Sequence, residues 1–409
     1  MGTFEELYHH VLEGKISPRG PLPEGYDPKH LDCLVHPEKY ASVLQVKECE
    51  KCAYDKACQN SCVFDAIAED KDGKLYIDPE KCVGCEACIR ACKDDNLTAS
   101  RDVLPAMKTV RESKGRAYVL VAPAFFGQFS KEVTPGKLRT AFKALGFSGM
   151  VEVALFADIL TLKEALEFDQ NVQEIGDYHL TSCCCPVWIA MIRKIYHELM
   201  PHVPGAVSPM VASGRMIKRI CPDAVTVFVG PCLAKKKEAR EPDIADAVDY
   251  VLTFQEVQDI FQAADIRPAE LPDDAKDHAS TSGRLYARTG GVSQAVSEMV
   301  EQLRPAREIS VVAEQANGTK ECMAMIKRIQ EGKTNANFFE GMGCVGGCVG
   351  GPRAILPSDE GTRYVDDYAE RAAYRTPLEN PYARRVLEEL GITTVEELLE
   401  ADTLLTRKF

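Results

Sequence analysis

The segment CVGCEACIRAC, residues 82–92, constrains the fold more than any other feature, because its cysteines follow C-x2-C-x2-C-x3-C spacing. Gaps this short let one loop wrap three thiolates around an iron–sulfur cluster, while the fourth thiolate reaches a second cluster. The segment CEKCAYDKACQNSC, residues 49–62, repeats the pattern with three residues inserted in its second gap. By this exchange one 4Fe–4S cluster takes Cys49, Cys52, Cys58 and Cys92, and the other takes Cys62, Cys82, Cys85 and Cys88.

A pair of zinc sites is the alternative, because C-x2-C pairs also bind zinc. The proline that usually follows the fourth cysteine is also missing, since Val63 and Lys93 stand there. Two interlocked four-cysteine motifs 33 residues apart nevertheless favour two iron–sulfur clusters. Two clusters in series form a path for electrons, so a site that needs electrons is expected at its far end.

The composition is that of a globular protein, and its number of cysteines indicates that the thiols have a function. The 409 residues include 17 cysteines and carry a net charge of −13, which disfavours nonspecific binding to nucleic acid. The start MGTFEELYHHVLEG lacks the basic and apolar regions of a secretory signal, and no apolar run could span a bilayer. We therefore expect a cytoplasmic protein with no nucleic-acid or membrane partner, whose thiols bind metal instead of forming disulfides.

Beyond about residue 115 the chain alternates strand-like and helical segments. Apolar, strand-like runs cover 116–124, 150–156, 224–232 and 307–315, helical patterns cover 134–147, 157–175 and 320–332, and 249–266 continues the alternation. This alternation predicts an α/β fold with parallel sheets and helices on their faces. In such folds the functional residues gather in loops at the ends of strands.

Four further cysteines fall in such loops. Cys185 follows a short strand-like stretch and begins a helix, Cys232 ends the 224–232 strand, and Cys344 and Cys348 follow NFFEGMG. Four thiolates from three separate loops could together hold one more 4Fe–4S cluster. Cys33, Cys221 and Cys322 have no partners at ligand spacing, and we expect each to be a buried or an ordinary free thiol.

Three motifs around these cysteines resemble the signatures of the FeFe-hydrogenases. They are TSCCCPVW (181–188), GPCLAKKKE (230–238) and FEGMGCVGGCVGGP (339–352), and their family forms are approximately TSCCPxW, MPCxxKxxE and ExMxCxxGCxxGG. TGGVSQAV (289–296) and LENPYARRVLEELG (378–391) also look like family segments, and TSCCCP resembles a divergent branch of the family that is associated with sensing.

The resemblance implies an architecture. It is an α/β catalytic domain of two parallel-sheet lobes around the H-cluster, joined to a small α+β module like a bacterial ferredoxin. The corresponding division of the chain is an N-terminal extension (1–44), a ferredoxin-like domain with two 4Fe–4S clusters (45–105), the H-cluster domain (106–375) and a C-terminal helical segment packed on it (376–409).

The resemblance also implies ligands for the H-cluster, a 4Fe–4S cubane linked to a two-iron azadithiolate unit with CO and cyanide ligands. Cys348 would bridge the cubane to the two-iron unit. Lys235 would donate hydrogen bonds to a cyanide, and Met342 would pack beside the two-iron unit. The cubane ligands by motif position are Cys185, Cys232, Cys344 and Cys348, and the cofactor pocket would include Ala122 and Pro123.

A proton relay is implied by the same motifs. Counting back from Pro186, Cys184 takes the place of the family's relay thiol, and Glu164 lies 20 positions before it, as in the family. Glu164 and Glu167 are three residues apart, so a helix would place them on one face. Cys183 is then the extra residue; a thiol near the cofactor and a merely packed thiol both remain open.

The chain departs from the family pattern around this relay, whereas the cubane ligands are unchanged. Gly230 replaces a methionine, which would open space beside the two-iron unit or admit another side chain or water. Ala124 lies where a serine often donates to a cyanide. Pro204 and Asn171 fall where the relay serine and the outer arginine would be.

These departures leave three functions to compare. The first is reversible interconversion of H2 with protons and electrons, with a redox partner such as ferredoxin. The second is hydrogen sensing at low turnover, which would need a signalling partner. The third is iron–sulfur assembly of the Nar1 type without a two-iron unit, which the paired ferredoxin motif, Cys184 and the two glutamates disfavour.

Overall fold

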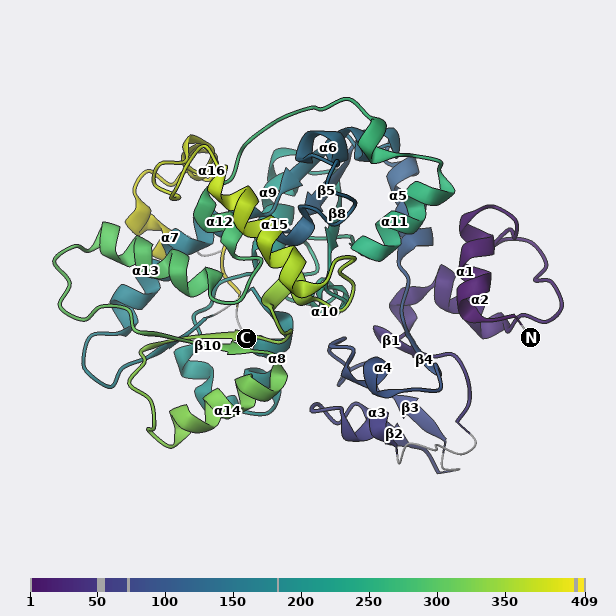
Figure 1. Cartoon of the computed structure of the whole chain (residues 1–409), viewed down its shortest axis with the longest axis horizontal. Helices are drawn as coiled ribbons and strands as arrows, with labels where there is room; N and C mark the ends of the chain where they lie inside the picture. Colours follow the sequence, from purple (N-terminus) through teal and green to yellow (C-terminus); the bar gives the residue numbers. More distant parts are fainter. Residues whose placement is uncertain (1, 50–55, 72–73, 182–183, 401–403, 408–409) are drawn as a thin grey trace.

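The computed structural model describes residues 2–49, 56–71, 74–181, 184–400 and 404–407 (Figure 1). The predictions for Cys52 and Cys183 therefore lie outside the described residues. Within these ranges the chain forms two parallel sheets with helices around them and a smaller module of short strands and helices. The predicted α/β class is confirmed.

The larger sheet contains four parallel strands in the order β6-β5-β8-β9. All five residues of β5 except Tyr118 are buried, as expected for a parallel sheet covered on both faces. Its strands are β5 (Ala117–Val121), β6 (Gly149–Glu152), β8 (Val225–Gly230) and β9 (Tyr250–Thr253). The helices packed on it are α5 (Val103–Glu112), α6 (Pro135–Ala144), α9 (Pro209–Ile220) and α11 (Phe254–Ala263).

The smaller sheet contains three parallel strands in the order β10-β11-β7. β7 is only His179–Leu180, and it pairs with Phe338 and Phe339 of β11. The other strands are β10 (Ala313–Asn317) and β11 (Phe338–Met342), and the helices packed around this sheet are α8 (Pro186–Lys194), α13 (Gly291–Leu303) and α14 (Thr319–Gln330). Two parallel-sheet lobes are thus present, as the motifs imply.

The small module holds the ferredoxin-like motifs. Two antiparallel strand pairs, β1-β4 and β2-β3, enclose a core that includes Cys58, Cys82 and Cys88. Figure 1 shows this module beside the two lobes. Its elements are β1 (Val43–Gln45), α3 (Ala57–Asn60), β2 (Ile67–Glu69), β3 (Leu75–Ile77), α4 (Ala87–Ala91) and β4 (Leu97–Ala99).

Both ends of the chain pack on the lobes. The N-terminal helix α1 (Phe4–Leu12) contacts α11, and its Tyr8 hydroxyl donates to Asp259 Oδ2 at 3.1 Å. The C-terminal turn η6 (Val395–Leu399) contacts the long helix α7 (Ala154–Asn171). The remaining helices and turns are α2 (Pro28–Val35), η1 (Pro37–Lys39), η2 (Pro123–Phe125), η3 (His197–His202), α10 (Ala234–Glu238), η4 (Pro268–Glu270), α12 (Thr281–Leu285), η5 (Gly347–Gly350), α15 (Ser358–Glu370) and α16 (Pro381–Glu389).

Two strand predictions are wrong in their bounds. The 150–156 run is strand only to Glu152, and helix α7 begins at Ala154. Residues 154–168 of α7 are all buried, so no polar face interrupts the apolar run, and periodicity cannot separate such a helix from a strand. The 307–315 run becomes strand only at Ala313, where pairing with Phe338 begins.

None of the helices within the described ranges combines the length and the apolar character needed to cross a membrane.

Candidate active site

Four cysteines meet at the carboxyl ends of the two sheets. Cys185 is the N-cap residue of α8, Cys232 lies two residues beyond β8, and Cys344 and Cys348 follow β11 around η5. The charge of Cys185 acts on each of the other three thiols, so the loops bring the four sulfurs close together. We call Cys185, Cys232, Cys344 and Cys348 the central thiols.

The surroundings of the central thiols suit an iron–sulfur cubane. Burial, followed by the charges of neighbouring thiols, raises the pKa of Cys348 to about 12 and raises those of Cys232 and Cys344 as well. Bound iron would offset that cost, because it stabilises the thiolate. The Gly343 amide donates to Cys185 Sγ at 3.3 Å, a contact of the kind that tunes such clusters.

Lys235 lies beside the central thiols. Its ammonium is buried and forms an ion pair with Glu238 at 2.6 Å between Nζ and Oε2. Burial lowers the pKa of Lys235, but the charge of Glu238, the hydrogen bond with Glu238 and the charges of Cys232 and Cys348 together outweigh that effect and raise the pKa overall. An ammonium has three donors, so the pair with Glu238 leaves capacity for a second acceptor.

The residues expected beside a two-iron unit lie at the ends of central strands. Met342 is the buried last residue of β11, and Ala122 follows β5 with its amide donating to Val229 O at 2.8 Å. Pro123 begins the η2 turn. Their expected contacts with a cofactor stay predictions.

Gly230 lies next to Ala122, and other atoms fill the space that a side chain at position 230 would occupy. A Cβ on Gly230 would lie 2.7 Å from Phe228 Cε1 and 3.1 Å from Ala122 Cβ. The Phe228 ring therefore occupies the position that a side chain at 230 would need. Of the alternatives for this departure, the entry of another side chain is confirmed.

The two predicted relay glutamates are buried on α7 and lie close to each other and to two basic side chains. Glu164 Oε1 is 3.5 Å from His179 Nε2, and Glu167 Oε1 is 3.1 Å from Lys163 Nζ. Burial, outweighing the charge of Lys163, raises the pKa of Glu167, and the charge of Glu164 adds to the rise. Half-buried Cys184 immediately precedes Cys185. The relay roles of these residues stay predictions.

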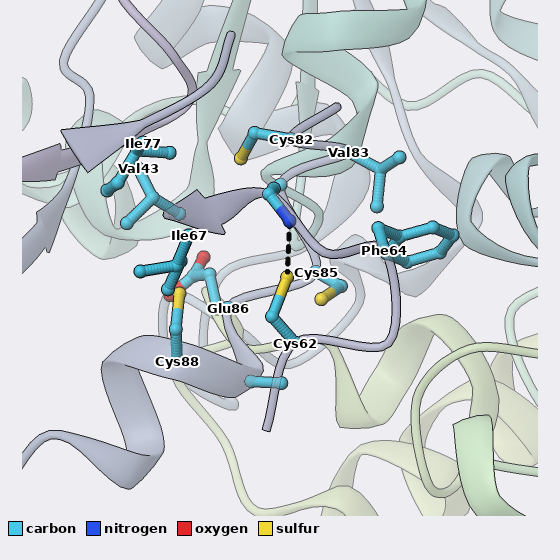
Figure 2. Close-up of a pocket in the computed structure, with 13 residues that line it drawn as sticks. Val43, Cys62, Phe64, Ile67, Ile77, Cys82, Val83, Cys85, Glu86 and Cys88 are labelled. Atoms are coloured by element: carbon cyan, nitrogen blue, oxygen red, sulfur yellow. Dashed lines mark hydrogen bonds between the residues drawn. The ribbon is translucent and has the colours of Figure 1, made fainter. Parts of the chain in front are cut away.

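A second set of thiols lines one cavity of the ferredoxin-like module (Figure 2). The charge of Cys62, from the first motif, acts on each of three thiols from the second motif. The Ala66 amide donates to Cys62 Sγ at 3.3 Å. These cavity thiols are Cys62, Cys82, Cys85 and Cys88, the set that the exchange between motifs predicts for one cluster.

The structure describes three of the four thiols that are predicted to hold the other cluster of the module. Cys49 Sγ accepts a hydrogen bond from Asn96 Nδ2 at 3.1 Å. Cys58 lies in α3 and Cys92 ends α4. Because Cys52 lies outside the described residues, the assignment of Cys49, Cys52, Cys58 and Cys92 to one cluster stays a prediction.

No three His, Cys, Asp or Glu side chains in the described part of the chain are arranged to hold a single metal ion. In a cubane each thiolate binds a different iron atom, so its ligands are spaced around the cluster and do not meet at one point.

The module and the lobes are joined tightly beside the cavity thiols. Glu86 accepts two hydrogen bonds from Arg353, at 2.9 and 2.5 Å, and both side chains are largely buried. A Cβ on Gly84 would lie only 3.1 Å from Ala234 Cα. Cys62 and Cys85 pack against the same apolar core as Cys185 and Cys232, so the cavity thiols face the central thiols.

Three features of the site escaped the sequence-based predictions. Glu340 caps α13 by accepting from the amides of Gly290 and Ser293 at 2.7 and 2.8 Å. Its place as the glutamate of the ExMxC motif was the available signal. The Cys322 thiol is buried, one of the two states expected for it, but its hydrogen bond to Met342 O at 3.5 Å was not predicted. The contact of His179 with Glu164 had no signal in the sequence.

Comparison with known proteins decides the family. A model of the iron-only hydrogenase large subunit, C-terminal domain, matches residues 115–352, more than half of the chain. The chain belongs to the FeFe-hydrogenase family. A 4Fe–4S binding domain model matches residues 75–98, which agrees with a ferredoxin-like module ahead of the hydrogenase domain.

Two hydrogenases are among the similar curated proteins. The periplasmic Fe hydrogenase large subunit of Nitratidesulfovibrio vulgaris is 28% identical over 370 residues, covering 70% of this chain and 88% of that protein. Iron hydrogenase 1 of Clostridium pasteurianum is 30% identical over 273 residues, and this chain spans about half of its length (47%). Apo FeFe-hydrogenase HydA1 of Chlamydomonas reinhardtii shares the fold, with a TM-score of 0.59 at 21% identity over 75% of this chain and 98% of that one.

Other relatives carry different names. The human nuclear prelamin A recognition factor is 24% identical over 379 residues, covering 78% of this chain and 83% of that protein. The cytosolic iron–sulfur assembly component 3 of Pongo abelii is also 24% identical over 379 residues. Membership of the FeFe-hydrogenase family therefore fixes the fold and the iron–sulfur character of the chain, while the reaction is argued below.

Proposed function

We propose that this protein interconverts H2 with protons and electrons at an H-cluster held by the central thiols. One observation carries the proposal: four partly buried thiols from three distant loops meet at the ends of both sheets, with two of the cavity thiols packed against the same core. When bound, the H-cluster would supply the two-iron unit, with its CO, cyanide and azadithiolate ligands, at which H2 is formed or split.

The chain's own residues would hold and orient this cofactor. Cys185, Cys232, Cys344 and Cys348 would bind the cubane, with Cys348 bridging to the two-iron unit. Lys235, already paired with Glu238 on one side, would donate to a cyanide. Met342 and the loop after β5 at Ala122 and Pro123 would keep water away from the unit.

Protons would pass between Cys184 and Glu164, and then toward Glu167. Each of these groups can both donate and accept a proton. Burial raises the pKa of Glu167, which keeps its carboxyl closer to the range in which a proton can be gained and lost near neutral pH.

Electrons would enter at the cluster of Cys49, Cys52, Cys58 and Cys92 and reach the central thiols through the cluster of the cavity thiols. A ferredoxin-type redox partner suits this route. We place the protein in the cytoplasm, where a reducing environment keeps thiols available to bind metal.

A direct test is to load the protein with a synthetic two-iron azadithiolate precursor. Infrared bands of CO and cyanide should appear, together with modest H2 turnover. Cys184→Ala should suppress turnover and leave the bands in place. If Cys183→Ala does so instead, the assignment of the relay thiol is wrong by one residue.

A hydrogen-sensing role at low turnover is the form of this activity that we favour. The substitutions at Gly230, Pro204 and Asn171 all affect the surroundings of the cofactor or its proton supply, and none affects a cubane ligand. Slow turnover with an intact redox centre suits a signal passed on to a partner protein. Turnover matching that of a fast hydrogenase under the same conditions would contradict this role.

Iron–sulfur assembly without the two-iron unit is the second candidate, supported by the relative named as an assembly component. It predicts intact 4Fe–4S clusters and no CO or cyanide bands after loading. The same infrared experiment therefore separates the two functions.

A further inference from the structure

His179 is a buried histidine in contact with the proposed proton relay. It is fully inaccessible to solvent, and its Nε2 lies 3.5 Å from Glu164 Oε1. Among the described residues neither ring nitrogen has a hydrogen-bond partner. A buried imidazole without partners is unfavourable, so its place beside a carboxylate calls for a functional reason.

The ring of His179 is held by aromatic neighbours. It stacks on Phe338 at 5.4 Å between centroids and meets the edge of Phe168 at 6.1 Å. β7 is only two residues long and pairs with β11, which fixes the backbone of His179 as well. The imidazole is therefore aimed at α7 by packing and by sheet register.

The charged and titratable groups around His179 come from four places. On α7 they are Lys163, Glu164 and Glu167, and on β11 the group is Glu340, which the charge of Glu164 reaches. Asp177 lies just before β7, and His202 ends η3. The His202 ring stacks on Tyr178 at 3.9 Å and is partly exposed, and His179 acts on it electrostatically. His202 is thus a partly exposed titratable group within electrostatic reach of His179.

We propose that His179 passes protons between Glu164 and the His202 side of the molecule. Pro204 and Asn171, where the family has a relay serine and an outer arginine, offer no titratable group, whereas His179 touches the first relay glutamate directly. The inference rests on the proposed hydrogenase activity and adds a route by which its protons reach solvent.

The transfer needs no co-reactant. Nδ1 takes a proton from the His202 side, giving an imidazolium; Nε2 then releases its proton to the Glu164 carboxylate, leaving a neutral ring with its proton on Nδ1. Return of the ring to its Nε2–H tautomer completes the cycle. For H2 oxidation the same steps run in reverse.

His179→Phe tests the proposal because it keeps the aromatic packing and removes both nitrogens. In protein loaded with the two-iron unit, turnover should fall about 10²-fold, with the CO and cyanide bands unchanged. His278→Phe is the matched control, because His278 also packs edge-on against an aromatic ring, Tyr382 at 4.5 Å, in the same domain. Its turnover should equal that of the wild type.

Two further measurements separate proton transfer from a structural role. Imidazole in the buffer should restore part of the turnover of His179→Ala, since it can fill the space left by the ring. The infrared C=O band that Glu164→Gln removes should shift in His179→Phe, because the partner of that carboxyl is lost.

The outcomes distinguish the two proposals. Wild-type protein that shows no CO or cyanide bands would overturn the proposed function and this inference with it. Wild-type protein with bands, combined with normal turnover in His179→Phe, would overturn the inference alone. Loss of turnover together with loss of the bands, and without imidazole rescue, would assign His179 a structural role and also overturn it.

Discussion

The central thiols and the carboxylates of Glu164 and Glu167 differ in how closely their surroundings keep to the family motifs. All four cysteines that the motifs demand are present at the central thiols, and the fold brings them together. Around Glu164 and Glu167, two family positions have changed, and Lys163 and His179 contact the carboxylates. A metal ligand needs one atom at one distance, whereas protons can pass along any connected set of exchangeable groups. Ligands are therefore fixed, while proton routes can be rebuilt.

The largest effect is expected at a central thiol. Cys232→Ala should prevent the cubane from forming and lower the iron content by about four atoms per chain, because one iron would lack its ligand. Iron analysis of protein reconstituted without the two-iron unit measures this. Cys322→Ala is the control: its thiol is fully buried and donates to Met342 O, yet the iron content should not change. Equal iron loss in both variants would break the distinction between ligand and packed thiol.

The next largest effect is expected at the carboxylates. Glu164→Gln should lower turnover by about 10²- to 10³-fold while leaving the iron content and the CO and cyanide bands intact, because the amide cannot carry the proton. The control is Glu298→Gln. Glu298 lies on α13 and pairs with Arg375, and this variant should turn over normally. Loss of iron in Glu164→Gln would mean that the two regions are not separable.

A third test concerns the Glu86–Arg353 pair, which we call the joint because it connects the ferredoxin-like module to the lobes beside the cavity thiols. Arg353→Ala leaves Glu86 buried without its partner and should lower the free energy of unfolding by about 3 kcal/mol. Arg371→Ala, which removes an exposed pair with Asp367, should cost less than about 1 kcal/mol. The midpoint of urea unfolding for each variant provides the measurement. Similar shifts would show that the joint adds little to stability.

The smallest effect is expected where the family methionine is missing. Gly230→Met should lower the free energy of unfolding by about 2 kcal/mol, because the new side chain collides with the Phe228 ring. Adding Phe228→Ala should recover part of that loss, which the double-mutant comparison of unfolding midpoints would reveal. Additive losses would indicate that Phe228 does not fill the vacated position.

The sequence predicted the parts of the site that depend on spacing. The structure places Cys62 beside the thiols of residues 82–88 and brings the central thiols near one another, as the motif spacing and the loops after strands led us to expect, while their roles as ligands stay predictions. The two-lobed α/β fold was predicted as well. These features depend on residues that lie close in sequence or at the ends of regular elements.

The remaining features depend on side chains that meet only in three dimensions. Neither the His179–Glu164 contact nor the Glu86–Arg353 pair has a fixed sequence spacing, since their members are 15 and 267 residues apart. The Phe228 ring could be placed over Gly230 only once its rotamer was known. The start of α7 was misplaced because a fully buried helix has no polar face to mark its period.

For the electron route proposed above, the close fit of Gly84 against Ala234 has a consequence for the timing of transfer. Tunnelling rates fall exponentially with distance, and at this point the two backbones are too close to admit even a methyl group without displacement. Together with the Glu86–Arg353 ion pair, this contact would keep the distance of the last electron-transfer step constant, without movement of the module relative to the lobes. Control of the electron-transfer rate would therefore act where a redox partner docks, at the Cys49 end of the module.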